Sequence, residues 1–167
     1  MLPPMIPTPQ PPEHYYYGLG RITTAYAICE AQVARIVCAC RGESTAVDGA
    51  WRTYADGPGK LRKALAELLN ERVDPLRAEV DQAATRHYGL GAERNRLAHA
   101  VIYLDPTMAG NWGITSPKDG DRTMPTAEEL AEVFSRMTRA ADELGRQVAR
   151  VLTIVSTTGL CMAPTGP

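Results

Sequence analysis

The apolar residues of the last third of the chain recur every three or four positions from residue 130 to residue 155. This spacing marks one face of an α-helix, whereas a strand would show strict alternation. Thr126 and Glu129 stand just before the run, in the arrangement of a capping box, so we expect a helix from about residue 126 to about residue 156. Such a helix must bury its apolar face against other elements. The face consists of Leu130, Val133, Met137, Ala141, Leu144, Val148, Val151, Leu152 and Val155.

Two earlier segments show the same periodicity. The first covers about 18–41, and Gly42 is placed to stop it. The second covers about 59–73 and carries an amphipathic row of leucines. Both segments are therefore predicted to be helices with one face turned to a shared core. Their apolar faces are Ile22, Tyr26, Cys29, Val33, Ile36 and Cys40 in the first, and Leu61, Leu65, Leu68, Leu69 and Val73 in the second.

A third segment begins at Asp74-Pro75, which is typical of an N-cap followed by proline in the first helical position. We expect this helix to continue until Asp105-Pro106, because the residue before a proline disfavours helical geometry. Gly89 and Gly91 each cost about 1 kcal/mol relative to alanine, so a bend or break is predicted there. Residues 105–125 contain three prolines and three glycines and are expected to be a long loop.

No segment shows convincing strand alternation, and one domain of ordinary size fits a chain of 167 residues that is 44% hydrophobic. The pattern therefore predicts an all-α fold, an antiparallel helical bundle of four to five helices, over residues 18–158. Residues 1–12 contain six prolines, so residues 1–17 are predicted to be a proline-rich, mobile N-terminal arm. Residues 159–167 are expected to form a flexible tail.

Charge and cysteine content narrow the functional classes. The formal net charge of −1 argues against a broad surface for duplex nucleic acid, so any contact with RNA or DNA must be local. We find no signal peptide and no stretch that reads as a membrane span, so a cytoplasmic protein without membrane contact is expected. The cysteines are interpreted as reduced core residues, and no metal or cofactor is expected. They are Cys29, Cys38, Cys40 and Cys161.

A cluster of polar residues interrupts the third predicted helix. Arg94, Asn95 and Arg96 are consecutive, and His99 follows within the next turn. In a helix, Asn95 and His99 share a face because they are four residues apart. Histidine can transfer a proton near neutral pH, and the planar fork of arginine can hold a phosphate. These groups suit metal-independent cleavage of a phosphodiester, with a second acid–base group supplied by the other copy in a symmetric dimer.

The string Arg94-Asn95-Arg96-Leu97-Ala98-His99 resembles the motif of the HEPN superfamily, small all-α domains in which an arginine and a polar residue precede a histidine on a late helix. The resemblance implies a homodimeric, metal-independent endoribonuclease, of the kind found in toxin–antitoxin and phage-defence systems. It further implies that His99 is the catalytic acid or base, that Arg94 binds the phosphate, and that Asn95 orients them. Some toxin members carry a tyrosine two residues after the histidine, and here that position is Val101.

Two readings of this motif remain open. In the first, the chain is the nuclease just described, its substrate is RNA, Arg96 and more weakly Arg86 contact that RNA, and an antitoxin or other protein restrains it. In the second, it is a non-catalytic HEPN-like helical module for binding or assembly, partnered with another defence or regulatory protein. Outside these two readings, the motif is accidental in a plain structural bundle, where His99 is a core or interface histidine and Arg94 and Arg96 lie on a solvated helix face with Glu93.

Overall fold

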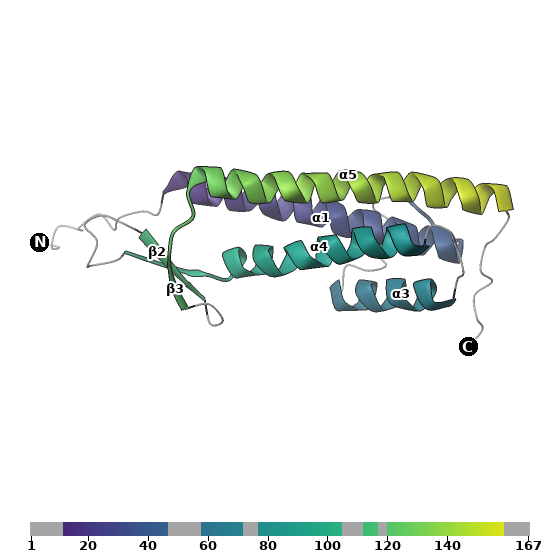
Figure 1. The fold of residues 1–167 in the computed structure, drawn as a ribbon, viewed down its shortest axis with the longest axis horizontal. Coiled ribbons are helices and arrows are strands. Elements are labelled where there is room, and N and C mark those ends of the chain that lie inside the picture. Colours follow the sequence, from purple (N-terminus) through teal and green to yellow (C-terminus); the bar gives the residue numbers. More distant parts are fainter. Residues whose placement is uncertain (1–11, 47–57, 72–76, 105–111, 117–119, 159–167) are drawn as a thin grey trace, which may run out of the picture.

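The computed structural model describes residues 12–46, 58–71, 77–104, 112–116 and 120–158. In this part of the chain four helices form an elongated bundle, with a small sheet at one end (Figure 1). The all-α class and the helical bundle are thus confirmed. The helices are α1 (Glu13–Arg41), α3 (Pro58–Glu71), α4 (Arg77–Ala98) and α5 (Ala127–Thr158), and the strands are β1 (Val101–Leu104), β2 (Trp112–Ser116) and β3 (Gly120–Thr123).

The helix directions are only partly antiparallel. α1 and α5 make the most extensive contact in the molecule and run in the same direction, side by side (Figure 1). α4 runs the opposite way and packs against both, while α3 packs on α1. The chain thus returns from the end of α4 to the start of α5 by way of the sheet.

Two predicted helix ends, the start of α5 and the end of α1, are confirmed, and each is determined by residues at the helix end itself. The backbone N–H of Thr126 donates to Glu129 Oε2 at 2.8 Å, and that of Glu129 donates to Thr126 Oγ1 at 3.2 Å, which is the predicted capping box. Gly42 ends α1 in the left-handed conformation, with φ of 71°, as its position predicted. α1 begins five residues before the expected start at residue 18, so residues 13–17 of the expected arm are helical.

The three-stranded sheet corrects the prediction that residues 101–104 continue the third helix and that 105–125 form only a loop. β1, β2 and β3 form an antiparallel meander in that order. The strands are too short to show clear alternation. Tyr103 pairs with Gly113, where a Cβ would lie 2.5 Å from the tyrosine ring, so the glycine makes room for the aromatic side chain.

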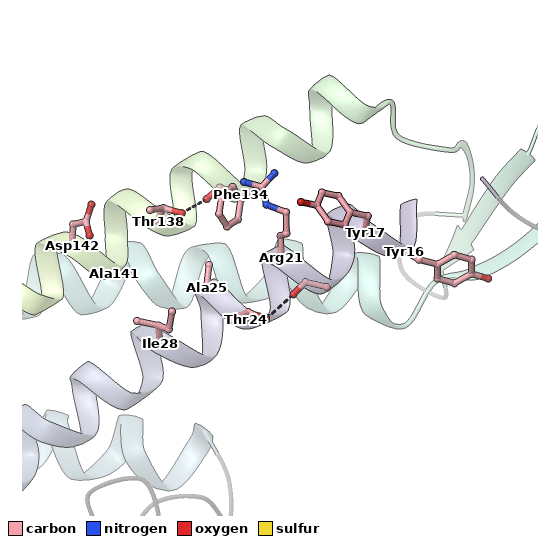
Figure 2. A pocket seen from close by; sticks show the side chains of 11 residues that line it. Tyr16, Tyr17, Arg21, Thr24, Ala25, Ile28, Phe134, Thr138, Ala141 and Asp142 are labelled. Atoms are coloured by element: carbon pink, nitrogen blue, oxygen red, sulfur yellow. Dashed lines mark hydrogen bonds between the residues drawn. The ribbon is translucent and has the colours of Figure 1, made fainter. Parts of the chain in front are cut away.

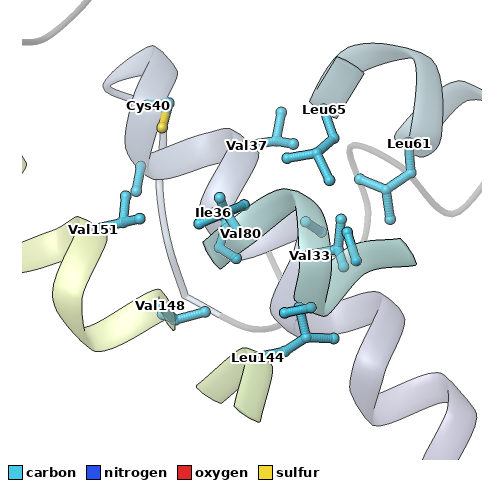
Figure 3. Packing of buried hydrophobic residues seen from close by; sticks show 14 of the residues in the cluster. Val33, Ile36, Val37, Cys40, Leu61, Leu65, Val80, Leu144, Val148 and Val151 are labelled. Atoms are coloured by element: carbon cyan, nitrogen blue, oxygen red, sulfur yellow. The ribbon is translucent and has the colours of Figure 1, made fainter. Parts of the chain in front are cut away.

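The core has two parts. The larger joins the C-terminal half of α1 to α3, to the first half of α4 and to the second half of α5 (Figure 3). The smaller joins the N-terminal half of α1 to the sheet and to the adjoining ends of α4 and α5. Cys29, Cys38 and Cys40 are buried in the core, as expected, and burial raises the pKa of Cys29 to about 12.

One helix bears on the expectation that no stretch reads as a membrane span. α1 is long and apolar enough to cross a membrane, judged by length and by the composition of its most apolar 18-residue window alone. However, 56% of its apolar window is buried inside the bundle, and the central helix of a packed domain has the same composition. The predictions for the first eleven residues, for Cys161 and for the tail 159–167 lie outside the described residues.

Candidate functional site

The polar motif occupies the end of α4 and the turn that follows it, where His99 lies just before the chain enters β1. Asn95 and His99 are exposed, and the backbone N–H of His99 donates to the Asn95 carbonyl at 3.0 Å. This bond keeps the helical spacing as far as residue 99. The two side chains therefore lie on one exposed face, as the sequence predicted.

Arg94 is half-buried and points toward α1. Its Nη1 donates to Asn95 Oδ1 at 2.7 Å, and its guanidinium carbon lies 5.5 Å from the centroid of the Tyr26 ring. Burial raises the pKa of Glu30, one turn after Tyr26, and the positive charge of Arg94 partly opposes that rise. The guanidinium is thus held by an amide on α4 and an aromatic ring on α1, and its charge acts through space on the Glu30 carboxylate.

Arg94 can approach Tyr26 so closely because of Gly91. A Cβ at this position would lie 2.5 Å from the Tyr26 hydroxyl oxygen and 3.0 Å from the ring. The helix α4 continues through Gly89 and Gly91, so the predicted break at the two glycines is wrong. Gly91 allows α1 and α4 to approach one another, whereas a Cβ on Gly89 would meet nothing within 4 Å.

The end of the motif helix is fixed from α1 by a tyrosine. The buried Tyr15 hydroxyl donates to the Leu97 carbonyl at 2.8 Å, and the Leu97 side chain is itself buried. The carbonyls of a last helical turn have no partner within the helix, so this bond satisfies one of them. Tyr15 thereby holds the turn that carries Asn95 and His99.

Arg96 and Arg86, the expected RNA contacts, face α5 and not α1. Glu93 pairs with Arg136 at 2.8 Å and more loosely with Arg96 at 3.8 Å. Arg86 is exposed and lies near Glu143, whose pKa is lowered mainly by the bond from Arg146. Arg86 and Arg96 line two neighbouring grooves along α4 and α5, of about 600 and 340 Å³, which share Glu93 and Arg136. The structure therefore separates Arg86 from the Arg94 side of the helix.

His87 belongs to the core. Its side chain is 0% exposed and lies between the rings of Tyr26, at 4.5 Å, and Tyr88, at 5.1 Å, centroid to centroid. Neither ring nitrogen has a hydrogen-bond partner. Burial lowers the pKa of His87 to about 4, so the imidazole is neutral at physiological pH and takes no part in proton transfer at the surface.

Sequence reasoning missed Tyr15, Tyr26 and Glu30. They are separated from the motif by more than sixty residues, and the helical periodicity marked only Tyr26, as a core residue. Trp112, at the start of β2, is partly buried against the smaller core. Within the described ranges, no group of three histidine, cysteine or acidic side chains gathers as a metal site.

Fold and motif together define a helical bundle that presents an exposed amide and imidazole at the end of α4, beside a half-buried arginine. No protein-family model matches the chain, and neither a curated protein nor a solved structure shows significant similarity to it.

Proposed function

We propose that this protein is a metal-independent endoribonuclease of HEPN type that acts as a homodimer in the cytoplasm. The proposal is carried by one observation: Asn95 and His99 are exposed on one side of the C-terminal end of α4, and Asn95 also accepts a hydrogen bond from Arg94. A base, an orienting amide and a phosphate-binding cation thus belong to a single helix end. His87 is buried, and His14 Nε2–H donates to the Pro125 carbonyl oxygen, 3.2 Å away, so His99 is the histidine suited to this chemistry.

The proposed reaction needs two proton transfers. His99 of one copy takes the proton of a ribose 2′-hydroxyl, whose oxygen then attacks the adjacent phosphorus. Arg94 stabilises the charge that develops on the phosphate. The bond from phosphorus to the 5′-oxygen breaks, and the leaving oxygen takes a proton from His99 of the second copy. The products are a 2′,3′-cyclic phosphate and a 5′-hydroxyl, and the second copy is required because one chain offers one exposed histidine near the motif.

The test is RNA cleavage by purified full-length protein in the presence of a chelator, for the wild type, Arg94→Ala and His99→Ala. Removal of a general acid–base group lowers such rates by about 10²–10⁴-fold, and removal of a group that stabilises the developing charge lowers them by about 10²–10³-fold, so both variants should lose cleavage while keeping their helical content. His14→Ala is the matched control, because it removes the other exposed histidine of the described residues. Cleavage that survives in His99→Ala would disprove the assignment.

A second function is favoured by the charges around the motif. Glu30 lies near Arg94, and Glu93 pairs with both Arg96 and Arg136. Carboxylates that neutralise the local cations weaken binding of a polyanion. This arrangement suits a non-catalytic HEPN-like module that binds a regulatory or defence protein, or an antitoxin. Intact RNA at every protein concentration tested, together with a stable complex with such a protein, would support this second function over the first.

A further inference from the structure

An apolar groove of about 660 Å³ lies between α1 and α5, on the face shown in Figure 2. Its floor and walls are made mostly of apolar side chains, and three of the residues at it are large and well exposed: Tyr17 at 67%, Tyr16 at 54% and Ile28 at 48%. The other lining residues are Gly20, Arg21, Thr24, Ala25, Phe134, Thr138, Ala141 and Asp142. An exposed apolar surface of this kind is usual for a binding site.

Arg21 gives the groove polar donors in an apolar setting. Its guanidinium carbon lies 3.9 Å from the centroid of Phe134 and 5.5 Å from that of Tyr17, so the group stacks on aromatic rings (Figure 2). Stacking covers the flat faces of a guanidinium and leaves its N–H groups free to donate in the plane. The Thr24 hydroxyl, by contrast, already donates to the Gly20 carbonyl. Arg21 therefore suits a ligand that is apolar but carries unpaired carbonyl groups.

A polyproline II segment has those properties. It has no internal hydrogen bonds, so its carbonyls are free, and proline-rich segments dock in grooves lined by aromatic rings. The first eleven residues, MLPPMIPTPQP, contain five prolines and no charged side chain. Pro4 and Pro7 are three residues apart, which places them on one face of a helix with three residues per turn.

The last residues of the arm join α1 close to one end of the groove. α1 starts at Glu13, and Tyr16 and Tyr17 lie within its first two turns. From Tyr17 to Ile28 the groove follows α1 for about 16 Å at 1.5 Å per residue. Eleven residues in the polyproline II conformation extend to about 34 Å, so the arm is long enough to turn back over the first turn of α1 and cover the groove.

We propose that the α1–α5 groove is a binding site for a proline-rich segment and that its occupant is residues 1–11 of the same chain. This proposal is independent of the proposed nuclease function, because the groove and the motif involve different residues. The arm would shield the exposed tyrosines, and a proline-rich segment of another protein would have to displace it to bind.

The test uses the full chain with Cys161→Ser and one added cysteine carrying a nitroxide. Ser135→Cys places the label beside Phe134, while Ser156→Cys is the matched control, about 31 Å further along α5. Both serines are exposed, and the other cysteines are buried. In protein with isotope-labelled methionine methyl groups, we expect the Met5 signal to lose most of its intensity with the label at position 135 and to keep it with the label at position 156.

A groove variant and a mixing experiment complete the test. Tyr17→Ser removes an exposed ring without opening the core, so it should restore the Met5 signal while leaving the helical content unchanged. Equal loss from both label positions, or no loss from either, would overturn the proposal. Loss that appears when the nitroxide and the isotope are on different molecules would show that the arm of a second copy is the occupant, which overturns the assignment to the same chain.

Discussion

His87→Phe should remove a pH dependence of the unfolding free energy that arises from the buried histidine. The His87 ring is 0% exposed, packs at tilted angles of 32° and 46° against the rings of Tyr26 and Tyr88, and has two nitrogens without a hydrogen-bond partner. Burial lowers its pKa from 6.5 to about 4. Between these two values the unfolded chain binds a proton that the folded chain does not bind, so stability falls as the pH falls through this range.

The size of the effect follows from the two pKa values. At 1.36 kcal/mol for each pKa unit, a fall from 6.5 to about 4 is worth ~3 kcal/mol. This contribution is fully present above the unfolded value and is lost by about pH 4. Phenylalanine keeps an aromatic ring between the two tyrosines and cannot be protonated. The variant should therefore be close to the wild type in stability near neutral pH and more stable than the wild type by ~3 kcal/mol near pH 4.

The assay is urea unfolding followed by far-ultraviolet circular dichroism, for both proteins, at a series of pH values from about pH 8 to about pH 4. The comparison of the two proteins matters because other groups also titrate. Glu30, whose pKa is raised by burial, changes stability in the opposite direction, and both proteins retain it. Parallel loss of stability in wild type and His87→Phe across the whole range would refute the reasoning.

Three further predictions concern the supports of the motif and the start of α5. Tyr15→Phe removes the bond to the buried Leu97 carbonyl and should cost about 1–3 kcal/mol in urea unfolding, with a lower cleavage rate than the wild type if the nuclease proposal holds. Gly91→Ala should destabilise the fold by about 1–3 kcal/mol, because its Cβ would meet Tyr26. The matched control Gly89→Ala should stabilise the fold by about 0.5–1 kcal/mol, because its Cβ meets nothing. Equal effects of the two variants in thermal unfolding would contradict the close approach of α1 and α4. Thr126→Ala should cost about 1 kcal/mol through loss of the capping box, whereas Ser135→Ala on the exposed face of α5 should change the unfolding free energy by less than about 0.5 kcal/mol.

The features that sequence predicted well are those set by neighbours in the chain. The capping box of Thr126 and Glu129 involves residues three apart, and the stop at Gly42 depends on its own left-handed conformation. The apolar faces of the helices were visible for the same reason, since a period of 3.6 repeats within each segment. Asn95 and His99 were placed on one face because helical spacing alone fixes that relation.

The features that sequence could not predict depend on partners far along the chain. Gly91 looked like a break because the ring that needs its space, Tyr26, is 65 positions away. Val101–Leu104 looked like a continuation of α4, because a four-residue strand is recognisable only beside its partner β2. The side of α4 that each arginine faces was likewise undetermined, since Tyr26 and Glu93 draw Arg94 and Arg96 in different directions.

The pairing of the first helix with the last has a consequence for synthesis on the ribosome. α1 emerges first, yet its most extensive partner, α5, begins at Ala127. At about 5–20 residues per second, roughly 5–20 s pass between completion of α1 and the first appearance of α5. For that interval the nascent chain presents an apolar segment that is long enough to cross a membrane and lacks its main packing partner. Chaperones and targeting factors that scan emerging chains for such segments would therefore meet α1 before the bundle can close.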